Sequence, residues 1–424
     1  MFKNRFLVNF FILMIWNYSI FAQTSLIDCL NKNLIEIESK QPNDNFAKFN
    51  EFSKVLANNK ILALGEVTHG IKEFIDFRGT LIKHLVTKLD YKIIVLEADF
   101  LGTQVLNDYI LYGKGNKYHA LLSMGIGIWA KQEFLNTVDW LKAYNLTKSF
   151  PNKIKFYGCD IGRGVAVARI AGGGIKLKKD LSDDAKEGLK LMQHLSLHVN
   201  KAEKIVIQKL ATELNEEMKQ LPDSSIFRQS ILTVLQSINW FQAGDWYKME
   251  KIRDKYMAEN VAWIYEHELN KNMILMAHNT HIAKNPVYDD IKRAGYYLKE
   301  KYKDEYYSLG FSFFTGEFLA SNEKTNKLEV FTMPEIKNEE FSEYIFSQCN
   351  TPNFILDFKT TQNDVNINLF LTKKTYSKNI GASYLKSNKD IKPGYMPLAD
   401  KFDGIAFFKR TSALLPPFAW DKRE

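Results

Sequence analysis

Acidic and imidazole side chains follow four short apolar runs of the sequence. The groups concerned are Glu66 and His69, Glu97, Asp160, and the pair His278 and His281. Ligands of open parallel sheets bind at the carboxyl ends of the strands. If the four runs are neighbouring parallel strands, these side chains meet at one edge of a sheet. The pattern therefore predicts a polar site at that edge.

An imidazole can act as a general base near neutral pH, because its pKa lies close to the working pH. Three of the eight histidines, namely His69, His278 and His281, fall at these strand ends. The other five lie in helical or loop stretches, where they are expected to be solvated or packed: His84, His119, His194, His198 and His267. Among these, His194 and His198 are four residues apart, a spacing that could also hold a metal.

The carboxylates at the strand ends have two interpretations. Aspartates often end strands as turn formers or helix N-caps, which suffices to explain Asp160 and also Asp99. Glutamate is not a favoured turn former, and a carboxylate next to a buried strand is costly unless it is paired or used. Glu66 and Glu97 are therefore the stronger functional candidates.

Arg78 is unexpected on its helix. The residues after Gly70 place an apolar face at helical spacing, formed by Ile71, Phe74, Ile75, Ile82 and Leu85. Arg78 falls on that face, and a buried guanidinium needs a carboxylate partner. We expect Glu66 or Glu97 to be that partner, in an ion pair that either braces the sheet or takes part in catalysis.

Other hydrolytic and nucleotide-binding motifs are missing. Ser312 lacks the second glycine of a serine nucleophile elbow, and Gly172 to Gly174 do not continue into a phosphate-binding loop. Cys159 could be a nucleophile, but a buried strand cysteine is the simpler interpretation. The mechanism that remains is attack by a water molecule. Either a histidine or a metal bound by His and Glu side chains would activate that water.

The same apolar runs predict the fold. They alternate with longer amphipathic segments, which is typical of βαβ units, and they span 60–64, 92–96, 153–157, 272–276 and 307–313. We therefore expect an α/β fold with a mainly parallel sheet flanked by helices. Residues 182–270, nearly free of Pro and Gly, predict an insertion of two or three long helices that could cap the sheet. The chain beyond Phe318 is expected to be irregular until a last strand at 403–408.

The N-terminus predicts export. Lys3 and Arg5 precede an apolar run that ends at Asn17, and Ala22 offers a cleavage site. This run is shorter than the roughly 20 residues of a membrane span, so we expect 1–22 to be a signal peptide. A retained anchor is the alternative. Residues 23–424 would then form one periplasmic or secreted catalytic domain, without a stable membrane anchor.

Composition limits the partners and the covalent structure. The net charge of +8 comes from interleaved Lys and Glu, which indicates a solvated surface rather than a nucleic-acid interface. Three cysteines are too few for a disulfide framework. We therefore expect no nucleic-acid partner and a fold that depends on its apolar core.

Taken in order, these residues resemble the erythromycin esterase family. The matching motifs are Gly65-Glu66-x-x-His69-Gly70, Arg78, Leu96-Glu97, Gly158-x-Asp160, Arg253-Asp254-x-x-Met257 and Ala277-His278-Asn279-x-His281-Ile282. The resemblance runs from about residue 60 to about residue 408. It implies an α/β core with a helical insertion over a deep cleft, and hydrolysis of the lactone ester of macrolide antibiotics.

The resemblance also implies roles for the site residues. His69 is the implied general base, and Glu66 and Glu97 belong to its hydrogen-bonded surroundings. The implied opposing pair is His278 and His281, and Arg78 is the implied arginine. Any of these last three could stabilise the oxyanion. The resemblance does not settle whether a metal is needed, and we expect none.

A macrolide is large and mostly apolar, so its site should contain hydrophobic side chains. The candidates, at the predicted end of the helical insertion, are Trp240, Phe241, Trp246 and Tyr247. Ordinary helix packing explains them equally well. Two other functions remain open: hydrolysis of a different ester or amide, and binding of a macrocycle or metal chelate without turnover.

Overall fold

The structure is a computed structural model that describes residues 26–38, 49–125, 129–162, 170, 177–194, 200–286, 290–385 and 394–415. The predicted signal peptide, His198 and Gly172 to Gly174 lie outside the described residues, as does the side chain of His194. Among the described residues, no helix combines the length and apolar character that crossing a membrane requires.

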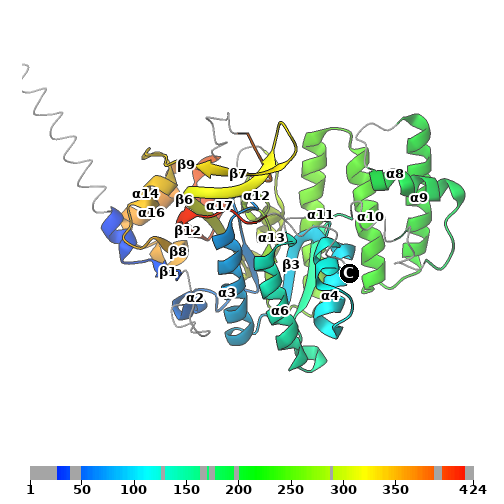
Figure 1. Cartoon of the computed structure of the whole chain (residues 1–424), viewed down its shortest axis with the longest axis horizontal. Coiled ribbons are helices and arrows are strands. Elements are labelled where there is room, and N and C mark those ends of the chain that lie inside the picture. Colours follow the sequence, from blue (N-terminus) through cyan, green and yellow to red (C-terminus); the bar gives the residue numbers. More distant parts are fainter. Residues whose placement is uncertain are drawn as a thin grey trace, which may run out of the picture.

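A ten-stranded mixed sheet forms the centre of the molecule (Figure 1). Its order is β1-β8-β12-β6-β2-β5-β3-β4, and β7 and β10 pair with β6. The six strands from β12 to β4 are parallel to their neighbours, whereas β8, β1 and β7 pair antiparallel. The strands are β1 (Ile35–Glu36), β2 (Ile61–Leu64), β3 (Ile93–Asp99), β4 (Lys155–Asp160), β5 (Met273–Met276), β6 (Tyr306–Asn322), β7 (Leu328–Met333), β8 (Asn353–Asp357), β10 (Ser383–Tyr384) and β12 (Gly404–Thr411). The predicted α/β fold with a mainly parallel sheet is confirmed.

Three predicted boundaries were wrong. Strand β3 continues to Asp99 and β4 continues to Asp160, so Glu97 and Asp160 lie inside their strands rather than after them. The chain beyond Phe318 is not irregular, because β6 continues to Asn322 and further elements follow. Most of these later strands are short or lie at sheet edges with exposed side chains, so they lack the apolar runs of the central strands. The exception is β8, whose residues Phe354, Ile355 and Leu356 are buried and form an apolar run that the prediction missed. Residues 374–377 and 394–397 form a separate two-stranded pair, β9 (Lys374–Ser377) and β11 (Gly394–Pro397).

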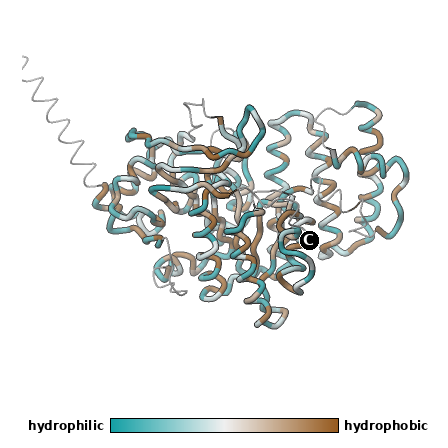
Figure 2. Tube along the Cα trace, in the orientation of Figure 1, coloured by the Kyte–Doolittle hydropathy of each residue, from teal (hydrophilic) through white to brown (hydrophobic). Residues whose placement is uncertain are grey.

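Helices cover both faces of the sheet, because successive side chains of a strand point to opposite faces. Leu62 and Leu64 of β2 pack in one core with α3 and α6, while Ile61 and Ala63 pack in another with α11 and α13. Figure 2 shows hydrophobic residues concentrated along these central elements. The helices outside the insertion are α2 (Phe49–Val55), α3 (Lys72–Lys88), α4 (Phe100–Tyr112), α5 (Lys117–Leu122), α6 (Gln132–Leu146), α12 (Asn279–Ile282), α13 (Ala294–Tyr302), α14 (Ser342–Ser347), α15 (Phe358–Thr361), α16 (Val365–Thr372) and α17 (Leu398–Lys401).

Four helices, rather than the expected two or three, occupy the stretch predicted as an insertion. They are α8 (Asp183–His194), α9 (Lys201–Lys219), α10 (Ile226–Gln242) and α11 (Trp246–His267). Helices α8, α9 and α10 share a hydrophobic core of their own and lie together at one end of the molecule (Figure 1). Helix α11 joins this group to the sheet, because its buried residues pack in the sheet core.

Candidate active site

The segment between β2 and α3 carries the first two candidate residues. Its glycines allow close contact with neighbouring chain segments. A Cβ atom on Gly65 would lie 2.0 Å from Oδ1 of Asn279, and one on Gly70 would lie 1.8 Å from the carbonyl oxygen of Leu319. Larger residues do not fit at either position without a shift of the chain. This packing fixes the backbone that presents Glu66 and His69.

Glu66 joins His69 to Arg78. Its Oε1 accepts a hydrogen bond from Nδ1 of His69 at 2.7 Å, and its Oε2 accepts one from Nη1 of Arg78 at 3.0 Å. Arg78 is 2% exposed, donates to the carbonyl oxygens of Leu64 and Gly65, and lies over the ring of Phe311. The predicted pairing of Arg78 with a strand-end carboxylate is confirmed, and the partner is Glu66 rather than Glu97. The net effect on the pKa of Glu66 is a decrease, because Arg78 and His69 outweigh the opposing effect of burial.

His69 keeps one ring nitrogen open. Within the described part of the chain, its Nε2 forms no hydrogen bond, and its side chain is 13% exposed against 3% for Glu66. Burial alone would lower the pKa of His69, but the adjacent Glu66 carboxylate outweighs it and raises that pKa above 6.5. His69 therefore combines an accessible nitrogen with a partner that fixes its tautomer and stabilises its protonated form.

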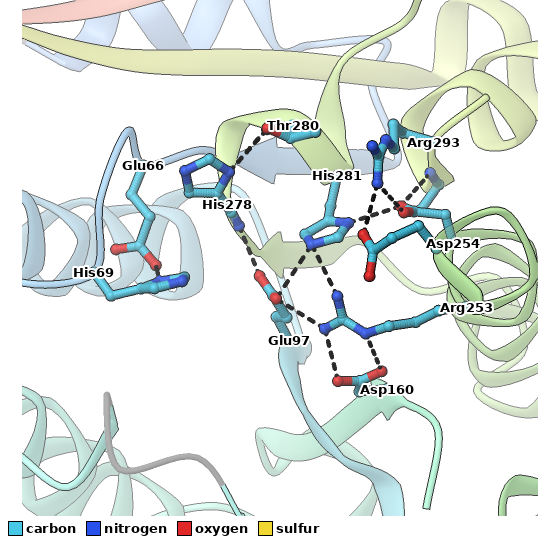
Figure 3. A network of polar contacts seen from close by, with 12 residues as sticks. Glu66, His69, Glu97, Asp160, Arg253, Asp254, His278, Thr280, His281 and Arg293 are labelled. Carbon is cyan, nitrogen blue, oxygen red and sulfur yellow. Dashed lines mark hydrogen bonds and ion pairs between the residues drawn. The ribbon is translucent and has the colours of Figure 1, made fainter. Parts of the chain in front are cut away.

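Arg253 on α11 is the centre of a second set of contacts, shown in Figure 3. Its guanidinium donates to both oxygens of Asp160, at 2.9 and 2.8 Å, and to Oε1 of Glu97 at 3.0 Å. The explanation of Asp160 as a turn former was wrong, since this carboxylate is 2% exposed and bound to Arg253 by a two-point contact. Asp99, in contrast, is the N-cap of α4 and accepts from the backbone N–H of Gly102.

His281 is held between two carboxylates. Its Nδ1 donates to Oδ1 of Asp254 at 2.7 Å, and its Nε2 lies 3.3 Å from Oε1 of Glu97. Asp254 is fully buried and also accepts from Arg293 at 3.1 Å. Burial opposes protonation of His281, but Asp254 and Glu97 outweigh it and raise its pKa to about 10. His281 is therefore an imidazolium at neutral pH. Its Nδ1–H is directed at Asp254, and its Nε2 lies close to both Oε1 of Glu97 and, at 3.2 Å, Nη1 of Arg253.

His278 is the opposite case. Its Nε2 donates to the carbonyl oxygen of Val67 at 3.0 Å, and its Nδ1 accepts from the backbone N–H of Thr280 at 3.2 Å. Burial and the nearby His69, whose ring centroid is 5.6 Å away, lower the pKa of His278 to about 4. His278 is therefore neutral and ties the segment after β2 to the turn after β5.

The charges of the linked groups favour a proton on His69. When His69 is neutral, the linked groups comprise five carboxylates and four cations. The carboxylates are those of Glu66, Glu97, Asp160, Glu250 and Asp254, and the cations are Arg78, Arg253, Arg293 and His281. Protonation of His69 brings the set to neutrality. The arrangement can thus accept a proton from a water molecule at His69 and stabilise the resulting cation.

The three proposed oxyanion donors are already engaged. His278 uses its N–H on Val67, His281 contacts two carboxylates, and Arg78 donates to Glu66 and to two backbone carbonyls. His278 must exchange a present hydrogen bond before it can donate to a substrate oxygen, and His281 must leave the carboxylates beside it. Arg78 differs, because its buried Nε has no hydrogen-bond partner within the described part of the chain.

The imidazoles do not converge as metal ligands. His278 and His281 direct their nitrogens at protein groups rather than at a common point with His69. Among the described residues there is no group of three or more His, Cys, Asp and Glu side chains that could hold a metal ion. We therefore assign no metal ligand within this site. Cys159 is buried on β4 and its thiol pKa is raised by that burial, as expected of a packed cysteine.

The four aromatic candidates separate into two pairs. Phe241 is buried in the core of α8, α9 and α10, and Trp240 packs against the same core. Trp246 and Tyr247 are exposed in the first turn of α11, about two turns before Arg253. The second pair is therefore the more exposed of the two, and the first pair takes part in helix packing.

Arg253, Asp254 and Arg293 were missing from the residues proposed as catalytic. The first two belong to a motif that carries the family resemblance, and that motif was the available signal. Arg293 precedes α13 and contacts Asp254 across 39 residues of chain. No local sequence pattern indicates that contact.

Comparisons with known proteins agree with the resemblance. The erythromycin esterase family profile matches residues 86–411. Erythromycin esterase type II of Escherichia coli is 26% identical over 379 residues, which cover 78% of this chain and 88% of that protein. A solved erythromycin esterase mutant in its open conformation is 19% identical with a TM-score of 0.62, and the match covers 87% of this chain and 94% of the other. A solved succinoglycan biosynthesis protein is 21% identical with a TM-score of 0.77, covering 92% and 98%.

The two structural matches show a common fold. The matched profile begins after His69 and Arg78, so the position of these two residues in the site rests on the contacts described above. Since the profile spans most of the chain, and the Escherichia coli relative is matched over most of its length, the chain belongs to the erythromycin esterase family.

Proposed function

We propose that the protein opens the lactone ester of a macrolide such as erythromycin, with His69 as the general base for water. The observation that carries this proposal is the pairing of His69 with Glu66. Nδ1 of His69 is used in this pairing, and Nε2 of His69 forms no hydrogen bond to the described residues. Every other ring nitrogen of His69, His278 and His281 contacts a protein group. The name of the Escherichia coli relative supports an ester of this class as the substrate.

In the proposed reaction, Nε2 of His69 removes a proton from water while the water oxygen attacks the lactone carbonyl carbon. The C=O bond becomes a C–O⁻ bond in the tetrahedral intermediate. This intermediate collapses with cleavage of the ring C–O bond, and Nε2–H returns the proton to the departing alkoxide. The products are a carboxylic acid and an alcohol in one opened chain, which is heavier than the substrate by one water.

Glu66 and Arg78 support this base in different ways. Glu66 keeps the proton of neutral His69 on Nδ1, so that Nε2 presents a lone pair. Arg78 holds Glu66 in place and keeps it ionised. Arg253 and His281 place positive charge around Glu97. The Glu97 carboxylate in turn accepts a hydrogen bond from the backbone N–H of His278 and so holds that part of the chain in place.

Incubation of the purified protein with erythromycin tests the proposal. We expect a product heavier by one water, and in ¹⁸O-labelled water we expect one label in the new carboxylate. If the protein hydrolyses other esters but not erythromycin, the proposed mechanism stands and the proposed substrate is wrong. Binding of erythromycin without any product, together with failure to hydrolyse other esters or amides, would reject the enzymatic function.

We further propose export to the periplasm or the medium, on the basis of the charged and apolar N-terminal residues. Expression of the full chain, followed by N-terminal sequencing of the mature protein, tests this. A mature chain that begins near Gln23 supports the proposal, and an intact N-terminus in the cytoplasm rejects it.

A further inference from the structure

A small cavity lies next to the turn that carries His278 and His281, but His69 and Glu66 do not line it. Asn279 and Thr280 form part of its wall. Its volume is about 20 Å³, whereas a single buried water needs roughly 10–15 Å³. The cavity can therefore hold a particle the size of a water molecule or a monatomic ion, and it is too small for a substrate.

Two lysines in the wall of this cavity are buried without a carboxylate partner. Lys378 is 4% exposed and Lys401 is 1% exposed. Lys378 donates to the carbonyl oxygens of Phe313 and Phe314, and Lys401 donates to the hydroxyl of Ser377 and the carbonyl of Gly394. Within the described part of the chain, neither ammonium lies within 4.0 Å of an acidic side chain. An ammonium has three donors, so each lysine has one N–H beyond these two contacts.

Glu343 is the one acidic residue in the wall, and neutral donors occupy it. Its Oε1 accepts from the hydroxyl of Ser312 at 2.7 Å and from the backbone N–H of Lys378 at 2.9 Å. Its Oε2 lies 3.4 Å from the hydroxyl of Ser342. The described wall thus contains two buried cationic groups and one buried anionic group. Burial of an uncompensated charge destabilises the folded state. A bound anion would balance this surplus of positive charge.

We propose that the cavity binds a chloride ion between Lys378 and Lys401. The cavity volume admits a monatomic anion. The remaining N–H group of each lysine supplies a donor for the ion. The hydroxyl groups of Ser342, Ser377 and Thr280 in the wall already donate to protein acceptors and would have to turn toward the ion to contact it. The ion would stabilise the folded state, because the unfolded chain has no such site.

The competing explanation is the loss of a proton from one lysine. Burial lowers the pKa of Lys378 and of Lys401 to about 8 in each case. If one of them were neutral and a water filled the cavity, no anion would be needed. The two explanations differ in whether the stability of the protein responds to halide.

The test compares the melting temperature (Tm) of the full chain in sodium chloride and in sodium gluconate at equal ionic strength. We expect the Tm of the wild type to rise by about 2 °C for each tenfold increase in chloride above the dissociation constant. Lys401→Met should abolish this dependence on chloride. Lys374→Met is the matched control, since Lys374 is an exposed lysine on β9, close in sequence to Lys378, and it should retain the wild-type dependence.

A second measurement does not require a variant. Crystals of the wild-type chain grown in bromide should show an anomalous peak between Lys378 and Lys401. Equal Tm values in chloride and gluconate, together with a cavity that holds only water, would overturn the proposal. A chloride effect of equal size in Lys401→Met would overturn it as well, because the effect would then arise at the surface.

Discussion

Nδ1 of His69 lies 2.7 Å from Oε1 of Glu66, so the protonation of this imidazole is coupled to a buried carboxylate. Glu66 raises the pKa of His69 above its ordinary value against the opposing effect of burial. A base must lose its proton before it can act. The rate of hydrolysis should therefore rise with pH through a pKa above 6.5.

Glu66→Gln tests this coupling. Removal of the negative charge should shift the rising limb of the profile of kcat/KM against pH to lower pH by about one to three units, the usual effect of an adjacent opposite charge. The maximal rate should also fall, because the amide no longer stabilises the imidazolium. A limb at the same pH in Glu66→Gln and the wild type would show that His69 does not produce it.

Arg78 should stabilise the fold as well as support catalysis. Arg78→Met leaves the buried Glu66 without its cation, and loss of one partner of a buried pair costs roughly 3–5 kcal/mol of the free energy of unfolding. Activity should fall together with stability. Arg78→Lys keeps the charge without the planar donor geometry, so it should retain most of the stability and lose activity if that geometry matters.

Denaturant titration and erythromycin hydrolysis measure both effects. Arg410→Met is the control, because Arg410 is an exposed arginine on β12 and its loss should change neither quantity. If Arg78→Met behaves like Arg410→Met, the ion pair with Glu66 does not stabilise the protein.

His281 should make the stability of the protein depend on pH in the alkaline range. Its pKa is about 10 in the folded state and near 6.5 in the unfolded chain. Its stabilising contribution is therefore fully present below pH 6.5 and is lost as the pH rises through about 10. His281→Gln should be destabilised by roughly 3–5 kcal/mol at pH 6, and the difference from the wild type should shrink toward pH 10. A difference that is independent of pH would show that His281 is not a buried cation.

We expect activity without a bound metal. The nitrogens of His278 and His281 are engaged with protein groups, and the proposed reaction needs only His69 and water. Dialysis against a chelator should leave hydrolysis of erythromycin largely intact. If activity is lost and one divalent ion restores it, these histidines must rearrange into ligands.

Much of the sheet and half of the site could be predicted from sequence. Central parallel strands are buried on both faces and read as continuous apolar runs, so β2, β3, β4 and β5 were found within a few residues. Glu66, Glu97 and His278 could be placed at one edge because polar groups directly after such runs are conspicuous. The pairing of Arg78 followed from its place on an apolar helical face.

The rest depends on contacts between distant segments. Arg253 meets Asp160 across 93 residues of chain, and it lies in a helix whose mixed charges resemble a solvated surface. The protonation states could not be predicted either. His278 and His281 are three residues apart, yet one is held neutral by burial and the other is held cationic by Asp254 and Glu97. Only the three-dimensional surroundings separate them.

The most direct measurement is the rate of erythromycin hydrolysis by His69→Ala. Loss of a general base should reduce kcat by at least roughly a hundredfold while the Tm stays near that of the wild type. His119→Ala is the control, because His119 is an exposed histidine on α5 and its removal should leave the rate unchanged. A folded His69→Ala protein that hydrolyses erythromycin at a rate close to the wild type would contradict the assignment of His69 as the base.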